Sequence, residues 1–100
     1  MGHQIIWSRG ASKDLDSMIR YIETDSIQNA QKVLLKIKER VLGLQNFPER
    51  YPLDRFHAEA EKTNTRAFEI YHIRVMYRVF DKHLEILQLR STYQKPDFRS

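Results

Sequence analysis

The stretch YHIRVMYRV, residues 71–79, decides the fold, because apolar and polar side chains alternate along it. Successive side chains of a β-strand point to opposite faces of a sheet, so a period of two is typical of a half-buried strand. The apolar set is Ile73, Val75, Tyr77 and Val79. If that set faces a covered side, Arg74 and Arg78 point to the open side of the same sheet.

Three further strands are predicted around this stretch. Residues 66–71 show the same alternation. The polar trio 81–83 separates the central stretch from the apolar run 84–89, which indicates a tight hairpin although the trio lacks glycine. Residues 4–7 form a short apolar run with aromatic and β-branched members, which is typical of a first strand.

Two helices are predicted between the first strand and the others. Residues 12–24 change to spacings of three and four, which place their apolar side chains on one helical face. Ser12 is the expected N-cap, because its hydroxyl can accept a hydrogen bond from a backbone N–H. A longer periodic helix is predicted to begin at Ser26. It ends at Phe47-Pro48, since proline disfavours helical geometry in the preceding residue.

The remaining segment, residues 48–65, contains two prolines, many charges and no apolar period, so it is predicted as a long loop with room for one helical turn. The order is therefore β-α-α-β-β-β, an α+β fold. We expect a curved, mainly antiparallel four-stranded sheet with a two-helix hairpin packed on one face, because this arrangement buries the apolar stripes. The length indicates a single domain, residues 1–100.

The composition limits the classes of function. Hydrophobic residues make up 41% and charged residues 30%, values typical of a folded soluble domain. The absence of cysteine excludes disulfides and thiolate metal sites, and the expected compartment is the cytoplasm. No apolar run approaches the roughly 20 residues of a membrane span, so no membrane association is expected. The net charge is +4, and residues 66–100 hold seven Lys/Arg against four Asp/Glu, which favours an acidic partner, either nucleic acid or a protein segment.

The arginines of the last strands form the first candidate site. We expect Arg66 and Arg90 to lie at strand ends near Arg74 and Arg78, so that four guanidinium groups converge on the open face. Guanidinium binds phosphate or carboxylate through two parallel hydrogen bonds, so the cluster predicts an anion site. The alternative is that each arginine pairs with a carboxylate of a neighbouring strand. Those carboxylates are Glu69, Asp81 and Glu85.

A histidine or a tyrosine could move protons at such a site. His72 is the best placed, because it lies at the junction of two strand runs, whereas His57 is in the long loop and His83 at a hairpin tip. Tyr93 and Lys95 follow the last strand, where the tyrosine could donate a proton, stack on a base, or simply pack in a folded tail. No pair of histidines or carboxylates has metal-ligand spacing and no glycine-rich phosphate loop exists, so no metal and no cofactor are expected.

Several short motifs follow one another along the chain. They are Trp7, Ala11…Asp14-Leu15…Ile19…Tyr21-Ile22, Asn29-Ala30, Leu44…Phe47-Pro48, the 71–79 stretch, and Ile86-Leu87-Gln88-Leu89 leading to Pro96. In this order and spacing, residues 4–97 resemble the RelE/ParE superfamily of bacterial toxins from type II toxin–antitoxin pairs.

The resemblance implies one of two activities. RelE-like members cleave messenger RNA in the ribosome with an arginine at the position of Arg74, a basic residue near Arg90, and often a C-terminal tyrosine or histidine. ParE-like members lack that set and poison DNA gyrase, and a small antitoxin neutralises both kinds. This sequence keeps Arg74 and Arg90 but has Phe98 where RelE-like enzymes place the tyrosine. A phenyl ring cannot transfer a proton, so the resemblance favours the ParE-like branch.

Three hypotheses for the function follow. The first is a ParE-like toxin of the plasmid-stabilisation type, which inhibits gyrase and growth and is silenced by a cognate antitoxin. The second is a ribosome-dependent endoribonuclease, an mRNA interferase, in which Arg74 and Arg90 stabilise the extra phosphate charge. His72 or Tyr93 would then move the protons. The third is a non-toxic relative that only forms complexes. The expected binding residues are Arg66, Arg78 and Lys95.

We expect the antitoxin to present an acidic, amphipathic segment that covers an apolar groove by the helices and reaches the basic face. The basis is the net charge of +3 in residues 66–100 next to apolar strands, a surface suited to a disordered acidic peptide that folds on binding. The sequence leaves the oligomeric state open between a homodimer and a toxin–antitoxin heterotetramer. It also leaves the target open between gyrase and the ribosome with its mRNA.

Overall fold

The computed structural model describes residues 2–92, and these form an α+β fold in the predicted order. The elements are β1 (Gln4–Trp7), α1 (Arg9–Glu23), α2 (Ile27–Leu42), the 3-10 turn η1 (Gly43–Gln45), α3 (Ala60–Thr63), β2 (Thr65–Ile70), β3 (Ile73–Val79) and β4 (His83–Ser91). Helix α3 is the one helical turn expected in the long segment. None of the helices in this part of the chain is long and apolar enough to cross a bilayer.

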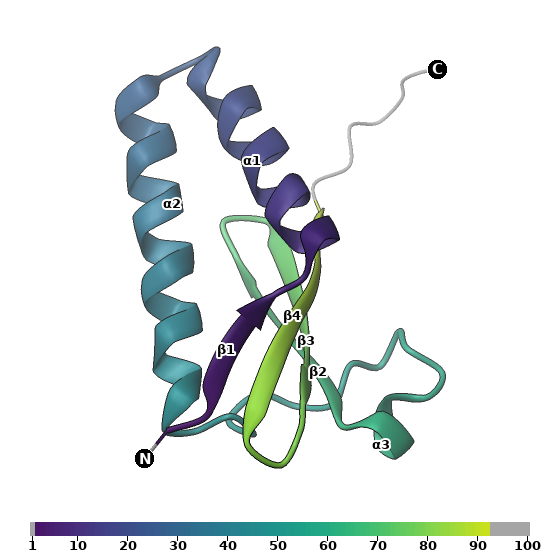
Figure 1. The fold of residues 1–100 in the computed structure, drawn as a ribbon. Helices are drawn as coiled ribbons and strands as arrows, with labels where there is room; N and C mark the ends of the chain where they lie inside the picture. The colour runs from purple at the N-terminus through teal and green to yellow at the C-terminus, as the bar shows by residue number, and fades with distance from the viewer. Residues whose placement is uncertain (1, 93–100) are drawn as a thin grey trace.

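The four strands form one sheet in the order β1-β4-β3-β2. Strand β3 pairs antiparallel with β2 and β4, and β1 pairs parallel with β4. Helices α1 and α2 form a hairpin on one side of this sheet, whereas the segment between α2 and β2 runs along its base to the other side (Figure 1). The prediction of a mainly antiparallel sheet covered on one face by two helices is therefore confirmed.

Strand β3 shows the alternation that the sequence predicts. Ile73, Val75, Tyr77 and Val79 are all buried, whereas the residues between them are only half-buried. The buried set packs against side chains of α1, α2, β2 and β4, which include Leu15, Val33, Ile37, Phe68, Leu84 and Ile86. Burying this apolar area is the main favourable term in folding, so β3 is the centre of the core.

Helix α1 begins one turn earlier than predicted, because Ser8 rather than Ser12 is its N-cap. The Ser8 hydroxyl accepts a hydrogen bond from Ala11 N at 3.0 Å and donates one to the Leu87 carbonyl at 3.1 Å. Leu87 has no partner in the β3–β4 register, so its carbonyl is available for this contact. At the second helix, Ser26 caps as predicted and accepts from Asn29 N at 3.0 Å.

The β2–β3 hairpin turns at Tyr71 and His72, which have φ angles of 54° and 62°. A two-residue turn with positive φ at both positions matches the twist of the flanking strands and is usually built with glycine or asparagine. His83 lies at the tip of the β3–β4 hairpin as predicted, because Phe80 N donates to its carbonyl at 2.8 Å across the turn, and its ring stacks on Phe80 with centroids 4.4 Å apart. His72 lies in the turn of the β2–β3 hairpin.

The side chain of Tyr77 generates a prediction about stability at high pH. Its hydroxyl donates to the Pro48 carbonyl at 2.7 Å, and burial raises the pKa of the Tyr77 phenol from 10.0 to about 12. The unfolded chain loses the phenol proton first, so this contribution to stability is complete below pH 10 and falls as the pH rises from 10 to about 12. We expect the free energy of unfolding of the wild type to fall relative to Tyr77→Phe across that range.

Urea unfolding of both proteins at about pH 8.5 and about pH 11 measures the difference. A difference in unfolding free energy between wild type and Tyr77→Phe that does not change with pH would contradict the claim that burial raises the pKa of Tyr77.

Candidate functional site

Arg74 of β3 and Arg90 of β4 lie directly opposite each other, because they are partners in the antiparallel register. Both line a cavity of about 240 Å³ on the side of the sheet away from the helical hairpin. We call it the arginine cavity, and it is lined by Asp54, Phe56, His57, Arg74, Met76, Gln88 and Arg90. These two positions are therefore neighbours on the face where the sequence pattern places them.

The charge of Arg74 is offset by two carboxylates. Its Nη2 donates to Asp54 Oδ1, and its Nη1 donates to Glu69 Oε2 at 3.1 Å. The side chain of Arg74 is 16% exposed and that of Asp54 is 1% exposed, so this pair is screened from water. The Arg74 guanidinium also lies 4.7 Å from the centre of the Phe56 ring. Pairing with Glu69 is the cross-strand alternative considered from the sequence, and the β2–β3 register places these two residues opposite each other.

Asp54 reaches Arg74 from the long segment between α2 and β2. Its N–H donates to the Thr65 carbonyl at 2.9 Å, and its Oδ1 accepts from Phe56 N at 3.0 Å. The other oxygen, Oδ2, is buried and has no hydrogen-bond partner within residues 2–92. The sequence carries no signal for this contact, because Asp54 and Arg74 are twenty residues apart and the segment around Asp54 has no period.

Arg66 lies on the helix-facing side of the sheet and not with Arg74. It is the register partner of Tyr77, which is buried in the core. Its guanidinium donates to the Tyr51 carbonyl at 2.6 Å and to Asn64 Oδ1 at 2.8 Å. The prediction that Arg66 converges with the other arginines is therefore wrong, because this side chain ties the long segment to the start of β2.

Arg78 and Arg90 share the open face with Arg74 but differ in environment. The Arg78 guanidinium lies 4.7 Å from the centre of the Phe80 ring, and its Nε is buried without a partner among the residues described. Arg90 is exposed and forms no ion pair with any residue from 2 to 92. Tyr93 and Lys95, the other predicted site residues, lie outside the described residues.

The histidine at the arginine cavity is His57 and not His72. His57 comes from the long segment and lines the cavity, whereas His72 lies in the β2–β3 turn and lines a different hollow with Met18 and Tyr21 of α1. His72 is therefore not among the residues that line the arginine cavity. In the described chain no group of three His, Cys, Asp or Glu residues is arranged to hold a metal ion.

A second candidate surface lies on the helical side. A groove of about 460 Å³ runs between the helices, and it is lined by Trp7, Ser12, Leu15, Asp16, Ile19, Leu34 and Lys38. Helix α2 also exposes three large apolar side chains, Ile27, Leu35 and Leu42, and Leu35 is 70% exposed. Spacings of seven and eight place these three on one helical face. We call the groove and these side chains the helical groove.

The chain belongs to the ParE toxin family, because the family model "ParE toxin of type II toxin-antitoxin system, parDE" matches residues 5–96. A solved structure of similar fold, from the chromosomal ParDE TA system from P. aeruginosa, has a TM-score of 0.70 and 24% sequence identity. The match covers 91% of this chain and 97% of that chain. No curated protein matches the sequence.

Proposed function

We propose that this ParE-family toxin acts by binding, that its target is DNA gyrase, and that a cognate antitoxin neutralises it. Family membership supports the toxin role and an antitoxin partner. The observation that carries the proposed mode of action is the pairing of Arg74 with Asp54 and Glu69.

Catalysis of RNA cleavage needs cationic donors aimed at the charge that develops on the phosphate. Two donors of Arg74 already bind carboxylates, and these anions would repel a phosphate placed beside them. Arg78 and Arg90 form no ion pair with any described residue, and of these two side chains on this face only Arg90 is exposed. A single exposed arginine suits contact with an acidic protein surface better than it suits phosphoryl chemistry, which favours gyrase binding over the endoribonuclease alternative.

The helical groove is the proposed docking surface for the antitoxin. Its apolar side chains on α2 are exposed, and burying one leucine completely is worth about 2 kcal/mol. Lys38 lies in the groove, and Lys32 and Lys36 are on the same helix, so acidic residues that flank the apolar positions of a partner helix would find cations nearby. These features support an acidic, amphipathic segment as the occupant.

A supercoiling assay tests the target. We expect the purified chain to inhibit purified DNA gyrase in a dose-dependent way, and Arg90→Glu to weaken the inhibition about tenfold, because reversing one contact charge costs about 1.4 kcal/mol or more. Lys32→Glu on α2 has a similar charge change and is the control. In a translation assay with the same protein, the mRNA should stay intact.

Supercoiling that is unaffected at every concentration would show that the target is wrong. Cleaved mRNA would then support the endoribonuclease, and intact mRNA would support a non-toxic relative. If mRNA cleavage occurs and survives Arg74→Ala and Arg90→Ala, the arginines are not catalytic.

Binding of the antitoxin tests the docking surface. We expect Leu35→Ser to weaken binding of the proposed antitoxin about tenfold, because serine cannot supply the apolar area that Leu35 would bury against the partner. Leu53→Ser, on the segment between α2 and β2, is the matched control. Affinity should also fall as the NaCl concentration rises, since surface charge pairs are screened. Equal effects of the two variants, or binding that is insensitive to salt, would contradict the proposal, and calorimetry measures both.

A further inference from the structure

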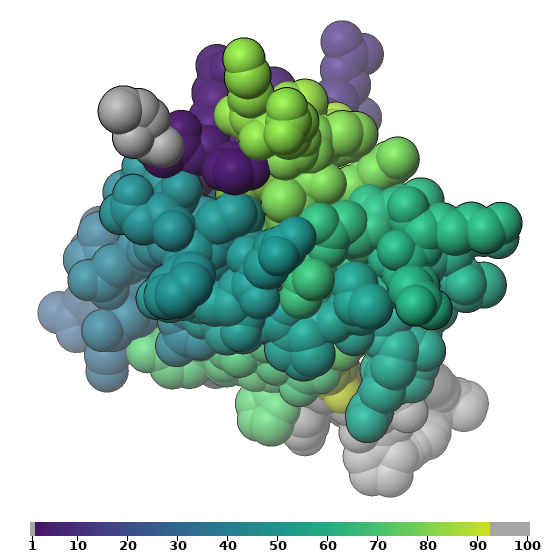
Figure 2. Space-filling model, turned by 90° about the horizontal axis from the view of Figure 1, so that it is seen from below, coloured from purple at the N-terminus to yellow at the C-terminus, as the bar shows by residue number. Residues whose placement is uncertain are grey.

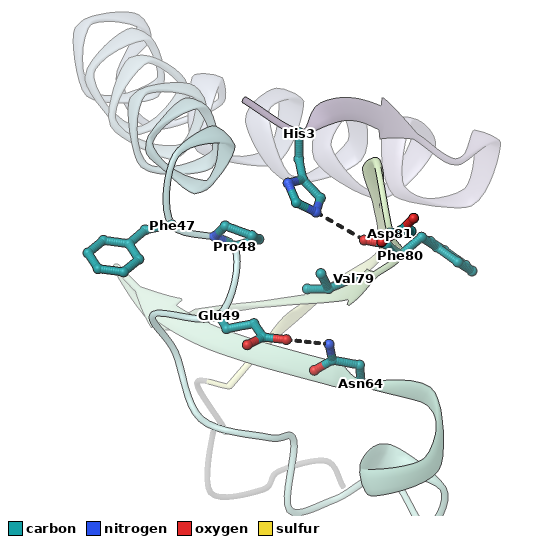
Figure 3. Close-up of a pocket in the computed structure, with 8 residues that line it drawn as sticks. All are labelled: His3, Phe47, Pro48, Glu49, Asn64, Val79, Phe80 and Asp81. Carbon is teal, nitrogen blue, oxygen red and sulfur yellow. Dashed lines mark hydrogen bonds between the residues drawn. The ribbon is translucent and has the colours of Figure 1, made fainter. Parts of the chain in front are cut away.

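The base of the molecule carries a hollow that neither candidate surface includes. The start of β1, the residues after α2 and the β3–β4 turn meet on the face seen in Figure 2. The hollow has a volume of about 790 Å³. Its lining residues are His3, Phe47, Pro48, Glu49, Asn64, Val79, Phe80 and Asp81 (Figure 3). We call it the basal hollow.

The apolar part of the basal hollow can hold the stem of a side chain. Val79 and Pro48 lie between its polar groups in Figure 3, and the ring of Phe47 stands at one side and is 64% exposed. The guanidinium of Arg50 lies 5.8 Å from the centre of the Phe47 ring, so this ring already accepts a guanidinium of its own chain.

The Glu49 carboxylate in the hollow is held in place by neutral and cationic neighbours. Its Oε2 accepts from Asn64 Nδ2 at 2.7 Å, and Asn64 Oδ1 in turn accepts from Arg66 Nε at 2.8 Å. Asn64 has a φ of 55°, a left-handed conformation that asparagine tolerates better than most residues. Within residues 2–92, neither Glu49 nor Asp81 forms an ion pair.

The remaining polar group also offers an acceptor. The His3 Nε2 lies 3.0 Å from the Phe80 carbonyl, and because a carbonyl can only accept, this nitrogen carries the hydrogen. Neutral His3 therefore keeps Nδ1 as an acceptor. The lining of the hollow thus combines an apolar floor with an imidazole acceptor and two carboxylates that form no ion pair among the described residues, on a chain with a net charge of +4.

We propose that the basal hollow binds an arginine side chain in an extended segment of a partner protein. Guanidinium has five N–H donors, no acceptor and a flat face that stacks on aromatic rings, so it complements this set of groups better than an ammonium does. The hollow is open and wider than one side chain. The exposed ring of Phe47 can therefore contact an apolar residue next to the arginine in the partner segment. This inference is independent of the proposed gyrase and antitoxin contacts, which use other surfaces.

An NMR titration of the whole chain tests it. The probe is a capped tripeptide with arginine between two leucines, and the reference is the same peptide with neutral citrulline. We expect saturable shifts at the amides of Asn64, Val79 and Asp81, with the arginine peptide binding about tenfold more tightly than the citrulline peptide. Glu49→Gln should weaken binding about tenfold, because it removes one charge-assisted bond while its amide oxygen can still accept from Asn64. Glu23→Gln at the end of α1 is the matched control and should change nothing.

Five results would overturn the proposal. The first four are equal affinity for the two peptides, shifts that do not saturate or lie elsewhere, equal effects of Glu49→Gln and Glu23→Gln, and free arginine binding as tightly as the peptide. The fourth result would indicate a small-molecule site. Shifts at these amides that depend on protein concentration without peptide would assign the hollow to a second copy of the chain, and would also contradict the proposal.

Discussion

The ion pair between Asp54 and Arg74 is the interaction on which the open face of the sheet depends. Arg74 and Arg90 are direct cross-strand neighbours, and like charges in that position destabilise a sheet. Asp54 and Glu69 supply the compensating charge on Arg74. Conversely, a carboxylate as buried as Asp54 needs a cation, because an unpaired buried charge is costly. The pair therefore holds the segment between α2 and β2 against the sheet and sets the charge of that face.

This arrangement divides the surface into regions of different character. The helical side presents exposed apolar side chains on α2, and the open face presents the exposed Arg90 next to a neutralised Arg74. The base of the molecule, in contrast, has two carboxylates, those of Glu49 and Asp81, that form no ion pair with any residue from 2 to 92. Three regions with distinct chemistry suit a protein that works through contacts with other macromolecules.

Much of this fold could be predicted from the sequence, because periodicity is a local property. The alternation in residues 71–79 identifies β3 and its buried face, and the same pattern brings Arg74 to the open side. Arg66 could have been placed correctly as well. It lies two residues before Phe68 in the same strand, so both side chains point to the same face of the sheet, and Phe68 is buried in the core. The two-residue turn at Tyr71 and His72 was missed because it contains no glycine.

Other features depend on contacts between residues far apart in the chain. Ser8 replaces Ser12 as the N-cap because it also binds the unpaired carbonyl of Leu87 on β4. Asp54 belongs to the candidate site because it binds Arg74, and no sequence motif predicts this contact. Such contacts are set by tertiary packing, which overrides local propensity.

Urea unfolding of Asp54→Asn and Glu69→Gln tests whether the ion pair between Asp54 and Arg74 stabilises the fold. Each substitution replaces one of the two carboxylates that bind Arg74 with a neutral amide. The Asp54 side chain is buried, whereas the Glu69 side chain is half exposed. Removing one partner of a buried pair should lower the unfolding free energy by about 3 kcal/mol, whereas removing one partner of an exposed pair should lower it by less than about 1 kcal/mol. We expect a large loss of stability for Asp54→Asn alone. Equal losses, or an Asp54→Asn protein as stable as the wild type, would contradict this expectation.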